Sequence, residues 1–79
     1  MKKATIEYEK LQRQNAKLLK LIATELKNHE TEAKKEDLHY GHVGDVQHVK
    51  QLLKELLTSL RGAADEERMH AKIEEEINK

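Results

Sequence analysis

Five residues with chemically versatile side chains fall within one short segment near the middle of the chain. They are His39, Tyr40, His42, Asp45 and His48. Neutral imidazole and carboxylate groups are ligands for zinc and nickel, so the three histidines with Asp45 could supply three or four ligands. The spacing matches no specific closed zinc site. Metal binding by His39, His42 and His48 is therefore only a third interpretation, after the two that are given below, and no cofactor is expected.

A polar turn explains the same residues more simply. Gly41 and Gly44 would supply the unusual backbone angles of a turn, and Asp45 would cap the helix that follows. This interpretation predicts a turn over residues 36–45. The five side chains would then form an exposed epitope that a partner protein could contact.

The residues before this turn have the pattern of one long helix. No Gly or Pro occurs between Thr5 and Lys35, and apolar side chains recur at helical spacing at Leu11, Leu18, Leu21, Ile22 and Leu26. Thr5 is suited to the N-cap, while Lys34 and Lys35 suit the negative end of a helix. We therefore predict a helix over about residues 5–35.

The residues after the turn predict a second helix that ends near a glycine. Apolar residues mark one face from Val46 to Leu60. Arg61 and Gly62 resemble a cationic last turn followed by a C-terminal glycine, and Asp65 resembles a new N-cap. We predict a helix over about residues 46–61 and a helical segment over about 65–77, with a kink or break near Gly62. One continuous helix is the alternative.

Charge is distributed unevenly along the chain, although the total is zero. Residues 1–35 carry nine Lys or Arg and five Glu, whereas residues 62–79 carry three Lys or Arg and six Asp or Glu. A reversal near Tyr40 would bring these opposite charges together. The sequence therefore predicts an all-α fold, a long antiparallel helical hairpin that forms a single domain over residues 1–79.

Both predicted helices carry more apolar surface than a two-helix seam covers. The apolar face spans roughly 160° of the first helix and roughly 140° of the second. A chain of 79 residues without cysteine also lies at the small end of independently folding domains, where association commonly adds stability. We expect a homodimer with coiled-coil packing in a four-helix bundle, and both dimer orientations stay open. The predicted interface residues are Leu19, Leu26, Leu52 and Leu57.

The preferred function is a non-catalytic protein–protein interaction module or a small regulator of a larger protein. A general acid–base pair needs a pocket, whereas this architecture offers helix surfaces, so the chain is not expected to be an enzyme. No motif identifies the protein partner or the biological process.

Nucleic-acid association is the second interpretation. Arg13, Lys20 and Lys27 recur every seven residues and give the first helix a basic face that could contact phosphates. Zero net charge and a content of only two tyrosines argue against this partner. No apolar run approaches the roughly 18 to 20 residues that span a bilayer, and nothing resembles a signal peptide. We therefore expect a cytoplasmic protein without a membrane partner.

Overall fold

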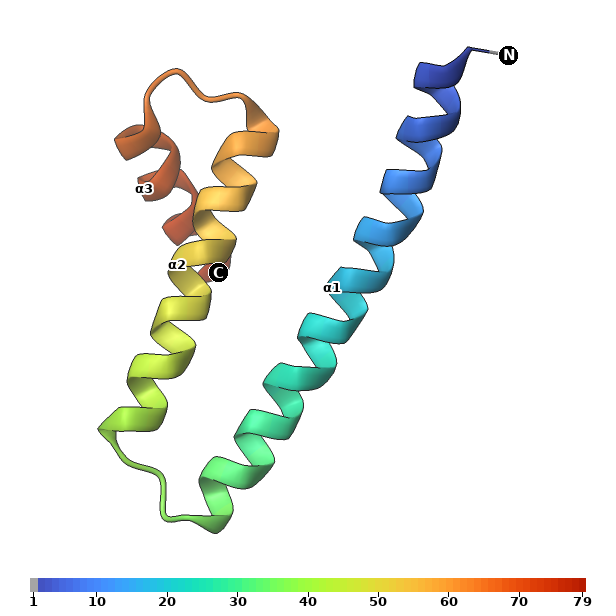
Figure 1. Cartoon of the computed structure of the whole chain (residues 1–79). Coiled ribbons are helices and arrows are strands. Elements are labelled where there is room, and N and C mark those ends of the chain that lie inside the picture. The colour runs from blue at the N-terminus through green and yellow to red at the C-terminus, as the bar shows by residue number, and fades with distance from the viewer. Residues whose placement is uncertain (1) are drawn as a thin grey trace. The chain divides into compact units, whose positions relative to one another are not determined.

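The computed structural model describes residues 2–79, which form three α-helices and no strand. The helices are α1, Lys3–Lys35; α2, Tyr40–Arg61; and α3, Glu66–Ile77 (Figure 1). The predicted all-α fold class is confirmed. The chain divides into two compact units between Leu38 and His39, and each unit is described by itself.

α1 is an uninterrupted helix that makes up nearly all of the first unit. It begins at Lys3, because the N–H groups of Thr5 and Ile6 donate to the carbonyl oxygen of Lys2 at 3.1 and 3.3 Å. Thr5 lies inside the first turn, so the prediction that it caps the helix is wrong. Lys3 and Ala4 are both good helix formers, and they allow the helix to begin before the threonine.

The last turn of α1 carries Lys34 and Lys35, as predicted. The N–H of Glu36 donates to the carbonyl oxygens of Glu32 and Ala33, both at 3.2 Å. Asp37 follows with a left-handed backbone angle, φ 61°. Aspartate is one of the few residues besides glycine that visits this region. The residue with a left-handed backbone conformation after α1 is therefore Asp37, and not Gly41 or Gly44.

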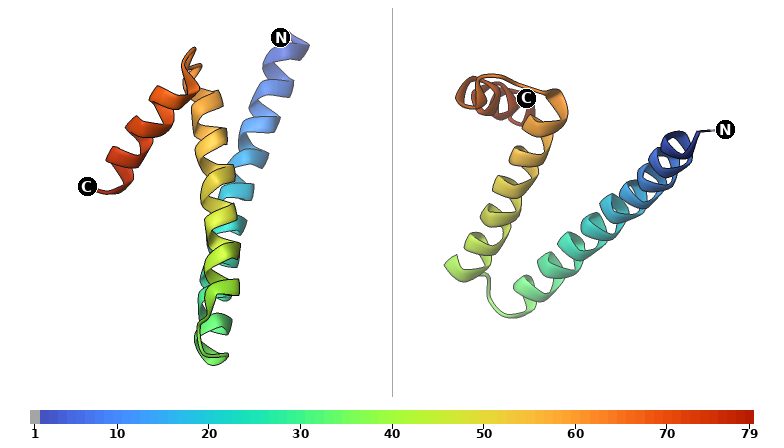
Figure 2. Two further views of the ribbon diagram at one scale, coloured as in Figure 1. Left: turned by 90° about the vertical axis from the view of Figure 1, so that its left-hand side faces the viewer. Right: turned by 45° about the horizontal axis from the view of Figure 1, so that its top comes forward.

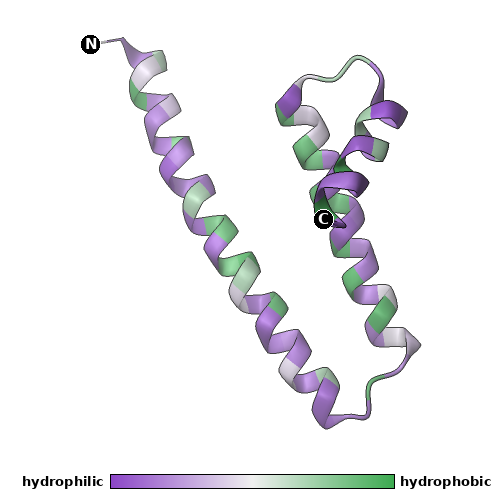
Figure 3. Cartoon of the chain, turned by 180° about the vertical axis from the view of Figure 1, so that it is seen from behind, coloured by the Kyte–Doolittle hydropathy of each residue, from purple (hydrophilic) through white to green (hydrophobic). Residues whose placement is uncertain are grey.

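Most of the surface of α1 is exposed. Within Lys3–Lys35, Ala33 is the buried residue. Hydrophobic positions are interspersed with hydrophilic ones along the helix in Figure 3. Lys27 and Lys34 both pair with Glu30, at 3.2 and 3.4 Å. Such exposed ion pairs contribute little to stability, so they do not explain why a helix of this length is ordered.

The second unit contains α2 and α3, which are joined by a short loop. α2 ends at Arg61, and Gly62 adopts a left-handed φ of 64° while its N–H donates to the carbonyl oxygen of Ser59 at 3.1 Å. Asp65 then caps α3, because its Oδ1 accepts the N–H of Arg68 at 3.1 Å. The helix is therefore broken at the glycine, as the sequence predicts, and is not continuous.

From this loop α3 turns back along α2 (Figure 1 and Figure 2). The buried residues of this unit are Thr58 on α2 and Ile73 on α3, which is only 1% exposed. The Thr58 hydroxyl donates to the carbonyl oxygen of Lys54 at 2.8 Å, so its burial is compensated by a hydrogen bond. The α2–α3 pair is a helical hairpin with a small core of its own.

Candidate interaction surfaces

The predicted turn epitope lies at the start of α2, which begins at Tyr40 and not at Val46. His39 is the N-cap, and its Nδ1 accepts the N–H of Gly41 at 3.0 Å. In return, Nδ1 of His42 accepts the N–H of His39 at 3.2 Å, and the two ring centroids lie 4.0 Å apart. This reciprocal cap satisfies two of the N–H groups that the start of a helix leaves open.

The reciprocal cap corrects two predictions about this segment. Asp45 lies inside α2 and is not its N-cap, so residues 40–45 are helical and do not form a turn. Neither Gly41 nor Gly44 has a positive φ. A Cβ at position 41 would lie 2.7 Å from Cε1 of His39, so the His39 ring would have to shift if Gly41 were replaced. The glycine makes room for the capping ring.

The five residues of the predicted epitope do not converge on one point. Tyr40 is 90% exposed, and Asp45 and His48 are exposed further along α2. Within residues 2–79, no group of three or more His, Cys, Asp or Glu side chains is arranged to hold a metal ion. Nδ1 of His39 and Nδ1 of His42 act as hydrogen-bond acceptors. This geometry gives no support to a metal site formed by His39, His42 and His48.

Charged contacts hold α3 against α2. Oε1 of Glu74 lies 2.8 Å from Nζ of Lys54 and 2.9 Å from Nζ of Lys50. Arg61 donates to both carboxylate oxygens of Glu76, at 2.6 and 3.1 Å. Two of the three C-terminal glutamates therefore have their cations on α2, within the same unit.

These contacts lower the pKa of both glutamates. Hydrogen bonds from Lys54 and Lys50 lower the pKa of Glu74 from 4.5 to about 2, although partial burial opposes them. The hydrogen bond from Arg61 lowers the pKa of Glu76, and the same bond raises the pKa of Arg61. The Lys54 side chain is only 14% exposed. Its pair with Glu74 is therefore screened less by water and salt than the exposed pairs of α1 are.

Acid is expected to weaken the α2–α3 contact within a defined pH range. A carboxyl whose pKa is lower in the folded state stabilises that state above its unfolded pKa of 4.5, and the contribution is lost as the pH falls towards about 2. Thermal unfolding followed by circular dichroism should show Tm decreasing through this range. In Glu74→Gln, Tm should fall much less over this pH range. In Glu75→Gln, at the next residue, Tm should fall as it does in the unaltered protein. The same pH dependence in both variants would contradict the assignment.

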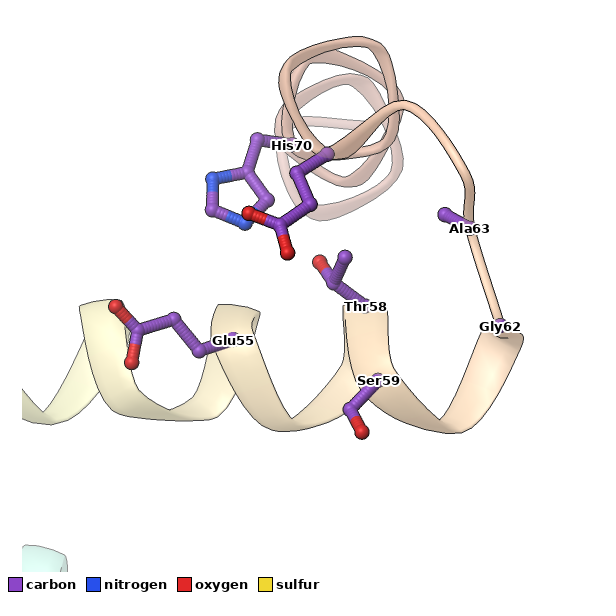
Figure 4. A pocket seen from close by; sticks show the side chains of 7 residues that line it. Glu55, Thr58, Ser59, Gly62, Ala63 and His70 are labelled. Carbon is purple, nitrogen blue, oxygen red and sulfur yellow. The ribbon is translucent and has the colours of Figure 1, made fainter.

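A shallow cavity of about 200 Å³ lies between α2 and α3, next to Gly62 (Figure 4). The His70 ring, from α3, lies over the side of α2 that carries Glu55 and Thr58. Ser59 also borders the cavity, but its side chain points away from α3. The one serine of the chain therefore does not face this histidine, and the pair does not form a nucleophile with its base.

Part of the apolar side of α2 lies away from the row of residues that contacts α3. The contacts to α3 come from a row that includes Lys50, Lys54 and Thr58. A second row is displaced by two residues, which is about 200° around a helix. Its members are 49–78% exposed and are Leu52, Leu56 and Leu60. α3 therefore leaves a row of leucines on the opposite side of α2.

The four predicted dimer-interface residues differ in exposure. Leu19 on α1 is 56% exposed and Leu52 on α2 is 51% exposed. Leu26 and Leu57 are half-buried. Other apolar residues of α1 are also exposed, namely Leu11, Leu18, Leu21 and Ile22.

The predicted basic face lies along α1, where Arg13, Lys20 and Lys27 are exposed. The hydrogen bond from Lys27 is the largest cause that lowers the pKa of Glu30, and Lys34 adds to it. An acid therefore lies beside Lys27, whereas Arg13 and Lys20 fall within residues 10–24, which contain no Asp or Glu.

None of the helices within residues 2–79 combines the length and the hydropathy that a bilayer span requires. Comparison with known proteins finds no matching family model, no matching curated protein and no matching solved structure.

Proposed function

We propose that this chain is a non-catalytic protein–protein interaction module, or a small regulator of a larger protein, that acts as a helical homodimer. In this arrangement α1 and α2 form an antiparallel hairpin, and two copies bury their leucine-rich faces in a four-helix bundle. The observation that carries the proposal is the exposure of apolar side chains along α1 and along the Leu52, Leu56 and Leu60 row of α2.

The energetic argument follows from the size of this exposed surface. Burial of a leucine or isoleucine side chain contributes roughly 1.5–3 kcal/mol. Isolated exposed leucines are common on protein surfaces, but a row along one helix face is typical of an interface. Several such residues on each helix give association a driving force that α3 does not use, because α3 packs on the other side of α2.

Association through a helix face also agrees with the charge pattern better than nucleic-acid binding does. The total charge is zero, and the basic face of α1 includes Lys27, which pairs with Glu30 at 3.2 Å. A basic face that runs along the helix without neighbouring acids would attract phosphates more strongly.

Sedimentation at micromolar concentration is expected to give about twice the mass of one chain. Leu52→Glu should weaken association at least about tenfold, because it places a charge in an apolar interface. Lys27→Gln, on the polar side of α1, should leave the association unchanged. Circular dichroism of both variants checks that the helices persist. A monomer at all concentrations with full helix content would overturn the proposal.

A further inference from the structure

The start of α2 is held by a cap whose two acceptors are both histidine nitrogens. Nδ1 of His39 accepts the N–H of Gly41 at 3.0 Å, and Nδ1 of His42 accepts the N–H of His39 at 3.2 Å. An imidazole accepts a hydrogen bond only while it is neutral, because the protonated ring carries a hydrogen on both nitrogens. Each of the two capping hydrogen bonds therefore requires a neutral ring.

Residues 40–45 are poorly suited to a helix without that cap. Gly41 and Gly44 lie within this segment, and glycine is the weakest helix former after proline. Val43 is β-branched, which also lowers helix propensity. Tyr40 and Val43 are 90% and 42% exposed, so neither side chain anchors the segment in a core. The first turn of α2 therefore depends on its cap.

Asp45 offers the same helix a second place to begin. Aspartate is among the preferred N-caps, and the apolar face with helical spacing runs from Val46 onward. In the structure Asp45 lies inside α2, because the helix extends back to Tyr40. We propose that α2 has two alternative starts that the pH selects. Near neutral pH it begins at Tyr40 with His39 as the N-cap, and in mild acid it begins at Val46 with Asp45 as the N-cap.

Protonation acts in the same direction on both capping hydrogen bonds. A proton on Nδ1 of His42 releases the N–H of His39, and a proton on Nδ1 of His39 releases the N–H of Gly41. The ring centroids lie 4.0 Å apart at the positive end of the helix dipole, which disfavours a charge on either ring. The capped start therefore binds fewer protons than the uncapped one. Its stability falls as the pH falls through the range of about 8 to 5 in which histidines ordinarily become charged.

The neighbouring charges oppose this effect only weakly. The acidic residues nearest to the cap in the sequence are Glu36, Asp37 and Asp45. All three are exposed, so their attraction for a charged ring is screened by water and salt. From α3, Glu74 pairs with Lys50, about two turns of helix beyond His42. The loss of an acceptor is not screened in this way, and it therefore decides the direction of the effect.

Cα chemical shifts measured by NMR at about pH 8 and about pH 5.5 test the two starts. Residues 40–44 should have helical shifts at the higher pH. At the lower pH the ratio of helical to non-helical conformers in this segment should fall at least about fivefold, the usual effect of losing one hydrogen bond. Residues 49–60 should stay helical. Both pH values lie above 4.5, so the acid loss of the Glu74 pair does not contribute. Helical shifts over residues 40–44 at both pH values would overturn the proposal.

His39→Ser combined with His42→Gln is the matched variant, because it keeps both acceptors and removes both protonation sites. Serine at the N-cap and glutamine three residues later form the common capping box. In this double variant α2 should begin at Tyr40 at both pH values. His48→Gln removes a histidine outside the cap and should respond to pH as the unaltered protein does. Loss of the first turn in acid by the double variant, or its retention by His48→Gln, would contradict the role assigned to the capping rings.

Discussion

Replacement of Ile73 by alanine is expected to destabilise the α2–α3 unit by about 2–5 kcal/mol, the usual range for truncation of a buried isoleucine. Ile73 is 1% exposed and is the buried residue of α3. The unit of residues 39–79 is close to the size below which a single core is marginal. Loss of this side chain should therefore release α3 from α2. Hydrogen exchange measured by NMR should show that the amides of α3 lose most of their protection.

Ile77→Ala is the matched control, because Ile77 belongs to the same helix and is 53% exposed. This variant should retain the protection of the α3 amides, with a change in stability well under 1 kcal/mol, as for an ordinary surface substitution. Equal loss of protection in both variants would show that Ile73 is not the core of the unit.

The second large effect concerns two glycines of the second unit. Substitution by alanine should lower the stability at Gly62 and raise it at Gly44. Gly62→Ala should destabilise the second unit by about 1–2 kcal/mol, because Gly62 has a left-handed φ of 64° at the end of α2. Gly44→Ala should stabilise it by roughly 0.5–1 kcal/mol, because Gly44 is inside α2 and the added Cβ would meet no atom within 4 Å beyond its chain neighbours and the adjacent helix backbone.

Urea unfolding of the three proteins, followed by circular dichroism, measures both changes on one scale. The two variants should differ from each other by roughly 2 kcal/mol, and the slopes of the transitions should be similar. A stabilising effect of Gly62→Ala would mean that the helix can continue through residue 62.

Much of the secondary structure could be predicted from the sequence because periodicity and terminal residues agree. The extent of α1 follows from the absence of Gly and Pro between Thr5 and Lys35 and from the two lysines of the last turn. The end of α2 follows from Gly62. The start of α2 was missed because Ser, Thr, Asp and Asn are the usual N-caps, and the pattern therefore favoured Asp45 over His39.

The contact of α3 with α2 could not be predicted from hydrophobic periodicity. Leu52, Leu56 and Leu60 mark an exposed face of α2. α3 instead contacts the row of Lys50, Lys54 and Thr58, beside the half-buried Leu53 and Leu57. On the contacting face, the methylene groups of Lys50 and Lys54 can pack against apolar surface while their ammonium groups pair with Glu74. The available signal was in the charges instead, because Lys50 and Lys54 are four residues apart on one face and Lys54 and Glu74 are equally distant from residue 64 in the loop.

The candidate site was predicted only in part. The sequence identified the residues around the start of α2 but not their roles, because hydrogen bonds between two histidine rings and the backbone follow no common motif. The exposed leucines were easier to identify, since an apolar arc wider than one seam is visible in the sequence itself.

The close approach of His39 to Gly41 makes the two positions dependent on each other during evolution. A chain that first replaces His39 by a smaller capping residue, such as serine, removes the ring that a Cβ at position 41 would meet. Position 41 can then accept alanine, which is the better helix former. In the reverse order, the intermediate protein carries both an alanine Cβ and the imidazole, so the ring must move away from its position at the cap. The order of the two substitutions therefore determines whether the intermediate keeps its helix cap.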